Sequence, residues 1–144
     1  MKNVISPIHI EDMYGTQIRY FKSPVFDKTR VPDMPWHVFT DLLKILALDE
    51  DASTFLLRKL RGDWPEPLTI ASENGVIVIT PNFMAEGLFD ALKHNKMLRP
   101  DNFLKIRGAY RRNLMVALSK MVPHLGPMER ILFVLDSMNN KEIA

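Results

Sequence analysis

The sequence contains no cysteine among its 144 residues. This absence excludes disulfides, thiolate zinc sites and cysteine nucleophiles, and it fits a protein of the reducing cytoplasm. No apolar run is long enough to span a bilayer, because the uncharged residues 75–85 are interrupted by Pro81. The N-terminal residues MKNVISPIHIED also lack the apolar segment of a signal peptide. We therefore expect a soluble, cytoplasmic protein with no membrane partner.

Motifs for common enzymatic chemistry are missing as well. The sequence has no GxSxG elbow, no GxxxxGK[ST] loop and no GxGxxG turn. His9, His37, His94 and His124 are too scattered for metal-ligand spacing, and we expect each to be a surface or capping residue. The acidic residues 49–51 lack the glycine and distal glutamate of a calcium loop. We therefore expect no catalytic site, metal or cofactor, and a protein that binds partners rather than an enzyme.

What remains is the composition of one ordinary globular domain, with 47% hydrophobic and 25% charged residues. Alternating apolar residues predict a β-hairpin over residues 8–20, and a proline-bearing loop follows over residues 23–35. Apolar residues at helical spacing predict a helix over residues 35–48, with Pro35 in its first turn. A second helix is predicted over residues 53–62, with a serine or threonine as its N-cap.

The second half of the chain repeats the hairpin and then becomes helical. Residues 68–80 predict a hairpin around an Asn-Gly turn, and Thr80 is expected to cap the helix that follows. A long helix is predicted over residues 101–121, and a final one after Pro127. The class is therefore α+β, with two short hairpins packed with about five helices and a helical C-terminal part.

The chain divides at about residue 98. Residues 1–98 form the predicted α+β module, and residues 99–144 form a helical pair that either packs on the same domain or makes the interface of a homodimer. Methionine is adaptable in packing and occurs at promiscuous interfaces. Five apolar residues lie at helical spacing in the last helix: Met128, Ile131, Leu132, Leu135 and Met138.

The positive charge is concentrated in one segment. Residues 93–120 carry eight basic residues and one acidic residue, a net charge of +7, whereas the rest of the chain carries 11 basic and 16 acidic residues, a net charge of −5. Such asymmetry favours an anionic partner. The alternative is a solvated helix whose charges pair with the acidic remainder of the chain.

A helical projection separates the basic residues of the long helix into two groups. Arg107 and Arg111 lie on one flank of the apolar stripe, where they can extend over the core edge or pair with acidic residues. Lys105 and Arg112 share a stripe roughly opposite the core and are freer to meet a partner. The centre of the apolar stripe consists of Phe103, Tyr110, Leu114, Leu118 and Met121.

The first two predicted helices are joined by a short polar turn, which is compatible with a helix-turn-helix. The second of them carries Arg58, Lys59 and Arg61 at positions expected to be exposed. Many compact proteins contain such a helix pair without binding nucleic acid.

Residues 5–95 resemble the Bro-N domain, the N-terminal module of baculovirus repeated-ORF proteins and of phage antirepressor-like proteins. The likeness rests on Ile18-Arg19-Tyr20-Phe21, on Pro35-Trp36-His37-Val38 with Asp41 and Leu46-Ala47-Leu48, and on Ile79 through Gly87-Leu88-Phe89 and Leu92. This chain departs from the family in having Ala47 where glycine is usual, His37 where an aromatic residue is common, and a long loop over residues 23–35. The resemblance implies a DNA-binding module of a viral or mobile-element regulator.

The leading hypothesis is a DNA-binding regulatory protein of phage or mobile-element type, antirepressor-like, that binds duplex DNA through basic helices. The alternative is a protein-interaction module that binds a host or repressor protein with an acidic surface, without DNA binding. The candidate nucleic-acid-binding residues are Arg58, Lys59, Arg61, Lys105, Arg107, Arg111 and Arg112.

Overall fold

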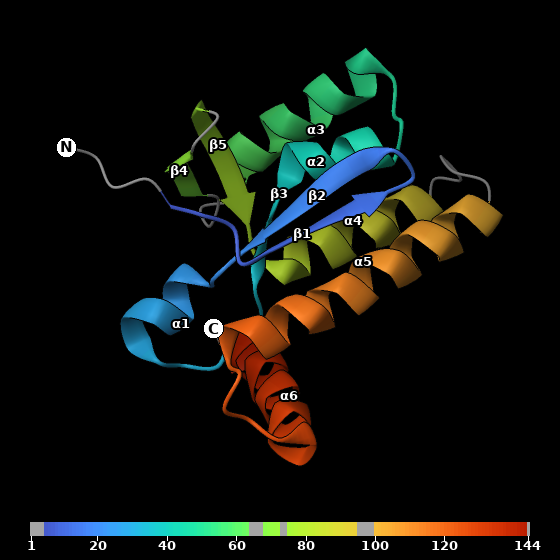
Figure 1. The fold of residues 1–144 in the computed structure, drawn as a ribbon. Coiled ribbons are helices and arrows are strands. Elements are labelled where there is room, and N and C mark those ends of the chain that lie inside the picture. The colour runs from blue at the N-terminus through green and yellow to red at the C-terminus, as the bar shows by residue number, and fades with distance from the viewer. Residues whose placement is uncertain (1–4, 64–67, 73–74, 95–99, 144) are drawn as a thin grey trace.

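The computed structural model describes residues 5–63, 68–72, 75–94 and 100–143, and this part of the chain forms a five-stranded antiparallel sheet with six helices (Figure 1). The strand order is β1-β2-β3-β5-β4, which confirms the α+β class. In chain order the elements are β1 (His9–Met13), β2 (Thr16–Phe21), α1 (Pro24–Thr29), β3 (Trp36–Val38), α2 (Phe39–Ile45), α3 (Glu50–Asp63), β4 (Leu68–Ser72), β5 (Gly75–Thr80), α4 (Asn82–His94), α5 (Pro100–Met121) and α6 (Pro127–Ile143).

Both predicted hairpins are present, as β1–β2 and β4–β5. At the first turn Tyr14 and Gly15 have φ values of 55° and 86°. Positive φ at both central residues produces a turn whose twist matches that of the flanking strands. Gly75 begins β5 with a φ of 112°, a conformation that glycine adopts without strain.

The predicted helix over residues 35–48 is wrong in its first part, because residues Trp36–Val38 form strand β3. This strand pairs with β2 on one side and β5 on the other, and so it joins the two hairpins into one sheet. Trp36 and Val38 point to one face of the sheet, whereas His37 points to the other, as strand geometry requires. The helix α2 begins only at Phe39.

Two further boundaries differ from the sequence-based expectation. The predicted loop over residues 23–35 contains α1, whose N-cap Ser23 accepts a hydrogen bond from the backbone N–H of Phe26. Helix α3 begins at Glu50, because the Asp49 carboxylate accepts from the backbone N–H of Ala52, and it continues past the expected end to Asp63. Both helices thus start at a side chain that satisfies free backbone N–H groups.

The main core lies between one face of the sheet and the helices α2, α4 and α5. Tyr20 of β2 is fully buried there, and its hydroxyl donates to the backbone carbonyl of Tyr110 in α5. A smaller cluster lies on the other face of the sheet and consists of Phe21, Trp36, Val38, Ile70 and Ile79. Within the described ranges, no helix combines the length and the apolar composition of a membrane span.

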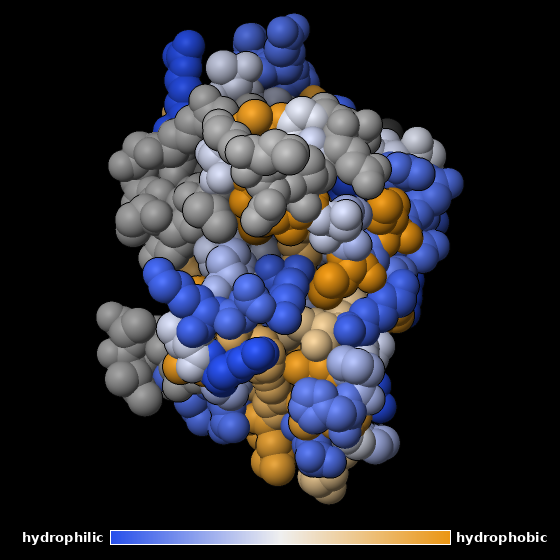
Figure 2. Space-filling model, turned by 60° about the vertical axis from the view of Figure 1, so that its left-hand side comes forward, coloured by the Kyte–Doolittle hydropathy of each residue, from blue (hydrophilic) through white to orange (hydrophobic). Residues whose placement is uncertain are grey.

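Helix α6 lies at the lower end of the molecule and exposes apolar side chains to solvent (Figures 1 and 2). Its inward face is anchored by Phe133, which packs edge-on against Phe26 of α1 with ring centroids 5.3 Å apart. Ser137 is also buried on this face. Helix α5 differs, because its apolar stripe is buried.

Candidate nucleic-acid interface

The burial of α5 determines which basic residues face solvent. All five residues expected at the centre of its apolar stripe are buried: Phe103, Tyr110, Leu114, Leu118 and Met121. Lys105 and Arg112 are seven residues apart, which is two helical turns, and they therefore share one face of α5. This face lies opposite the apolar stripe, and both side chains are exposed. The helical projection is therefore confirmed for this helix.

The two arginines on the flank of α5 are engaged within the protein. The Arg107 guanidinium lies over the ring of Phe103, 4.8 Å from its centroid. Arg111 donates to both carboxylate oxygens of Glu86 in α4, from Nη2 at 2.6 Å and from Nε at 2.9 Å. The hydrogen bond with Glu86 raises the pKa of Arg111 above its ordinary value. Glu86 therefore partly neutralises the charge of Arg111, whereas Arg107 is held against a neutral ring.

Lys105 and Arg112 are exposed on the face of α5 opposite the apolar stripe. Within the described residues neither makes an ion pair, and they lie two helical turns apart, which corresponds to roughly 10 Å along the axis. Arg112 lies close over Gly108, since a Cβ at that glycine would come within 3.3 Å of Nη1. Lys105 borders a cleft of about 260 Å³ that Tyr14 and Ile45 also line. Because they are two turns apart, the two cations lie on the same outward face of α5.

Three of the candidates lie on a different helix, α3. Figure 1 shows α3 at the upper end of the molecule and α5 lower down, and Leu56 of α3 packs against the same core as α5. Arg58 is exposed. Lys59 and Arg61 lie within α3, but their side chains fall outside the described part of the structure. Among the candidates whose side chains are described, Arg58 thus lies on a separate helix from Lys105, Arg107, Arg111 and Arg112.

The outer face of α5 also carries apolar side chains. Leu104, Met115 and Val116 are exposed beside the two cations. Apolar side chains gain nothing from contact with phosphates, whereas a protein partner can bury them. This mixture is the main structural feature that distinguishes the two functional hypotheses.

A groove of about 500 Å³ opens on the flank of α5, between α4 and α6. Asp33, Glu86 and Asp90 line it together with Arg111. Three carboxylates against one guanidinium give this flank a net negative charge, which disfavours contact with a phosphate backbone. Within the described residues no cluster of acidic and histidine side chains is arranged to hold a metal ion.

Two of the four histidines are buried, contrary to the expectation from sequence. His37 is fully buried between the hydroxyls of Thr80, at 2.8 Å, and Tyr110, at 3.3 Å. Burial lowers the pKa of His37 to about 3, so the ring is neutral at physiological pH. Thr80 ends β5 and α4 begins only at Asn82, so Thr80 is not the residue directly before the helix, contrary to the expectation from the sequence. His94 and His124 are exposed, as expected.

The second buried histidine contacts one of the basic residues of α5. The Nδ1 atom of His9 accepts from the Lys120 ammonium at 2.8 Å, and its Nε2 atom lies 3.0 Å from Oδ1 of Asn113. The strand β1 is thereby tied to α5. Since the sequence places His9 and Lys120 more than a hundred residues apart, no local signal could indicate this contact.

An ion pair that sequence reasoning missed joins β2 to α2. Arg19 donates from Nε and Nη2 to the two carboxylate oxygens of Asp41, at 2.9 Å each, and its backbone N–H also donates to this carboxylate. The hydrogen bond with Asp41 raises the pKa of Arg19. Both residues belong to the motifs that carry the Bro-N resemblance. Ala47, at the usual glycine position, has a left-handed φ of 53°.

Comparisons of the chain with protein-family models, with curated proteins and with solved structures find no match.

Proposed function

We propose that this protein is a DNA-binding regulator of phage or mobile-element type, antirepressor-like, that contacts duplex DNA through basic helices. The observation that carries this proposal is the outward pair of Lys105 and Arg112 on α5, which have no acidic partner among the described residues. Cations in this arrangement neutralise phosphates and release condensed counterions. Phosphate contacts position the protein on the duplex and do not by themselves read its sequence.

The resemblance to the Bro-N domain supports the proposal through two structural details. The arginine and aspartate of its motifs, Arg19 and Asp41, bind each other with two parallel hydrogen bonds. The usual glycine position, Ala47, adopts a backbone conformation that favours glycine. These contacts give physical roles to the residues of this chain that carry the resemblance.

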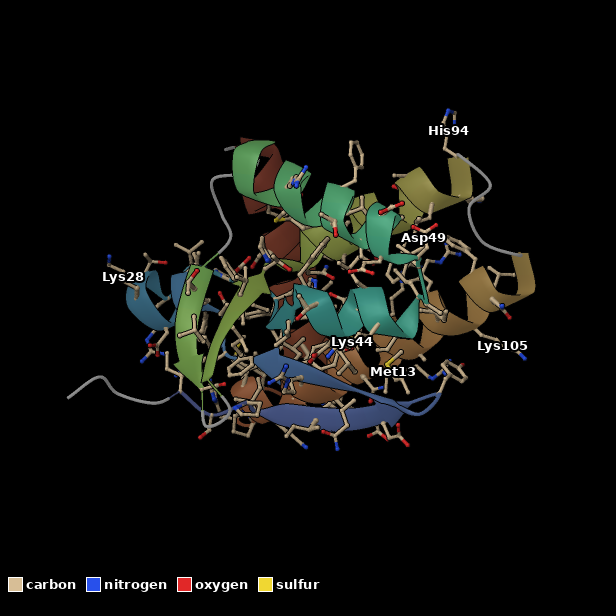
Figure 3. The ribbon with its side chains drawn as sticks, turned by 90° about the horizontal axis from the view of Figure 1, so that it is seen from above. Met13, Lys28, Lys44, Asp49, His94 and Lys105 are labelled. Atoms are coloured by element: carbon tan, nitrogen blue, oxygen red, sulfur yellow. The ribbon has the colours of Figure 1, made fainter. Side chains whose placement is uncertain are left out.

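The proposal is tested by titrating the protein against a duplex of mixed sequence at low salt. We expect binding that weakens as salt rises. The variant Lys105→Ala/Arg112→Ala should bind less tightly and reduce the slope of log affinity against log salt by about 1.8, if each cation neutralises one phosphate. The matched control Lys28→Ala removes an exposed cation from the opposite end of the molecule (Figure 3) and should leave the slope unchanged.

A separate variant, Arg58→Ala, identifies the DNA-binding surface. Because Arg58 lies on α3 and the cation pair lies on α5, comparing the two variants shows which helix contacts DNA. Absence of binding at high micromolar protein and low salt would exclude the DNA-binding function altogether.

A second function is favoured by the exposed Leu104, Met115 and Val116 beside the cations of α5. They suit a protein-interaction module that binds a host or repressor protein with an acidic surface, where charge raises the association rate and apolar contact provides affinity. Pull-down from a nuclease-treated host lysate separates the functions. Retention of a defined protein by the native chain, and its loss on Leu104→Ser, would favour this second function over DNA.

A further inference from the structure

Helix α6 is apolar on two opposite faces. Phe133 points inward and is buried, and Val134 packs against the same core. The outward face lies about half a turn away and is a stripe of large apolar side chains, each between 49% and 67% exposed: Met128, Ile131, Leu132, Leu135 and Met138. Figure 2 shows apolar side chains at the lower end of the molecule, where α6 and the turn before it lie.

A helix that is apolar on both sides is normally covered on both sides. The outward stripe is contiguous along α6, unlike single exposed apolar residues, which are common on protein surfaces. Its members Met128, Ile131, Leu135 and Met138 are spaced three, four and three residues apart, the pattern of a helix-to-helix seam. The cover that fits this stripe is therefore another helix.

We propose that the outward stripe of α6 binds the same stripe of a second copy of this protein, so that the chain forms a twofold symmetric homodimer. A twofold interface brings the same surface of both copies together and needs a stripe that can meet itself. The stripe satisfies this condition, because its five members are uncharged and Glu129 and Asp136 lie on its flank rather than along its centre. No like charges then come into direct contact at the seam.

The length of the stripe limits the area that the dimer can bury. A helix of 17 residues is about 25 Å long, and a pair in contact along this length buries several hundred Å² on each side. A standard stable interface buries about 800 Å² on each partner. The contact through α6 alone is therefore smaller than a standard stable interface, and we expect a dimer that dissociates on dilution. This inference is independent of DNA binding.

Sedimentation velocity of the full chain over a concentration series tests the proposal. The native protein should shift from monomer to dimer as its concentration rises. The variant Ile131→Glu/Leu135→Glu should remain a monomer at every concentration, and glutamate keeps the helix because its helix propensity is high. A circular dichroism spectrum and melting curve at low concentration show whether the variant is folded.

The matched control is Val76→Glu, which places the same charge on β5 at an apolar side chain that is 71% exposed. Its dimerisation should equal that of the native chain. A native chain that stays monomeric throughout would overturn the proposal, and so would a dimer that persists in Ile131→Glu/Leu135→Glu.

A second readout uses the absence of cysteine from the chain. Leu135→Cys introduces one thiol near the proposed twofold axis, and mild oxidation should link two chains at a concentration where the dimer forms. Val76→Cys should not crosslink under the same conditions. Equal crosslinking of the two variants would indicate random collision and would count against the dimer.

Discussion

The last two helices carry the same kind of apolar pattern and use it in opposite ways. In α5 the stripe that includes Leu114 and Leu118 is buried against the sheet and α4. In α6 the stripe that includes Ile131 and Leu135 faces solvent, and the helix is anchored by Phe133 from its other side. Helical periodicity therefore identifies a face that requires a cover. It does not tell whether the cover comes from the same chain or from another one.

The largest expected effect on stability is the difference between truncating a buried leucine in α5 and truncating an exposed leucine in α6. Leu118 has 0% exposure and Leu135 has 49%. Leu118→Ala should lower the free energy of unfolding by about 2–5 kcal/mol, because it removes buried contacts and leaves a cavity. Leu135→Ala should lower it by less than about 1 kcal/mol at concentrations where the chain is a monomer. Chemical denaturation at low protein concentration measures both values.

The outcome that would break the comparison is a similar loss of stability in the two variants. It would mean that α6 already has a cover on its outward side within the monomer. Repeating the measurement at high concentration sharpens the comparison, since the dimer should then add stability to the native chain and less to Leu135→Ala.

The next effect concerns the two faces of α6 itself. Phe133→Ala removes the aromatic contact with Phe26 and should release α6 from the body, at a cost of about 3 kcal/mol. Ile131→Ala, on the outward face, should leave α6 docked. Hydrogen exchange of the α6 amides distinguishes them, because only Phe133→Ala should remove protection without affecting β2. Equal protection in both variants would show that Phe133 is not the anchor.

The stability of the folded chain should depend on pH through His37, which lies beneath α5, whereas the outward face of α6 should not respond to pH. The folded chain holds the pKa of His37 near 3, whereas the unfolded chain has the ordinary value of about 6.5. Between these values the unfolded state binds one more proton, so stability should fall by about 1.4 kcal/mol per pH unit as pH drops below 6.5. Denaturation midpoints at pH 7 and pH 5 should show this fall, and His37→Gln should remove it.

The outward stripe of α6, unlike the region around His37, contains no titratable side chain. Dimerisation should therefore change little between pH 7 and pH 5, provided that the chain is folded. If His37→Gln retains the full pH dependence, the titrating group lies elsewhere.

Much of the fold follows from local patterns in the sequence. The two hairpins, α4 and α5 each have enough residues to show their periodicity and their turn or cap signals. Strand β3 was missed because three residues are too few to show alternation, and Trp36 happened to match the helical spacing of the residues after it. Its pairing comes from β2 and β5, which lie far from each other in the sequence. Helix α1 had a visible signal in Ser23-Pro24, which was read as part of a loop.

The candidate site was predictable only within one helix. The projection of α5 separated Arg107 and Arg111 from Lys105 and Arg112, and the contacts with Phe103 and Glu86 agree with it. The relation of α5 to Arg58 was not predictable, because the arrangement of α3 and α5 around the sheet depends on the whole fold. Pairs such as Arg19 with Asp41 connect distant segments and leave no local pattern.

The smallest expected effect is a gain of stability at Ala47, which lies on neither helix. This residue follows α2 in the left-handed region, where a Cβ costs about 1–2 kcal/mol. Glycine removes that cost but adds about 0.4–1 kcal/mol of chain entropy to the unfolded state, so Ala47→Gly should raise the free energy of unfolding by about 1 kcal/mol or less. The gain is a local backbone effect and should appear equally beside Leu118→Ala and Leu135→Ala. Ala91→Gly, at an exposed helical position in α4, should instead lose about 0.5–1 kcal/mol. Opposite signs in denaturation experiments would establish the left-handed conformation, whereas a loss at both positions would contradict it.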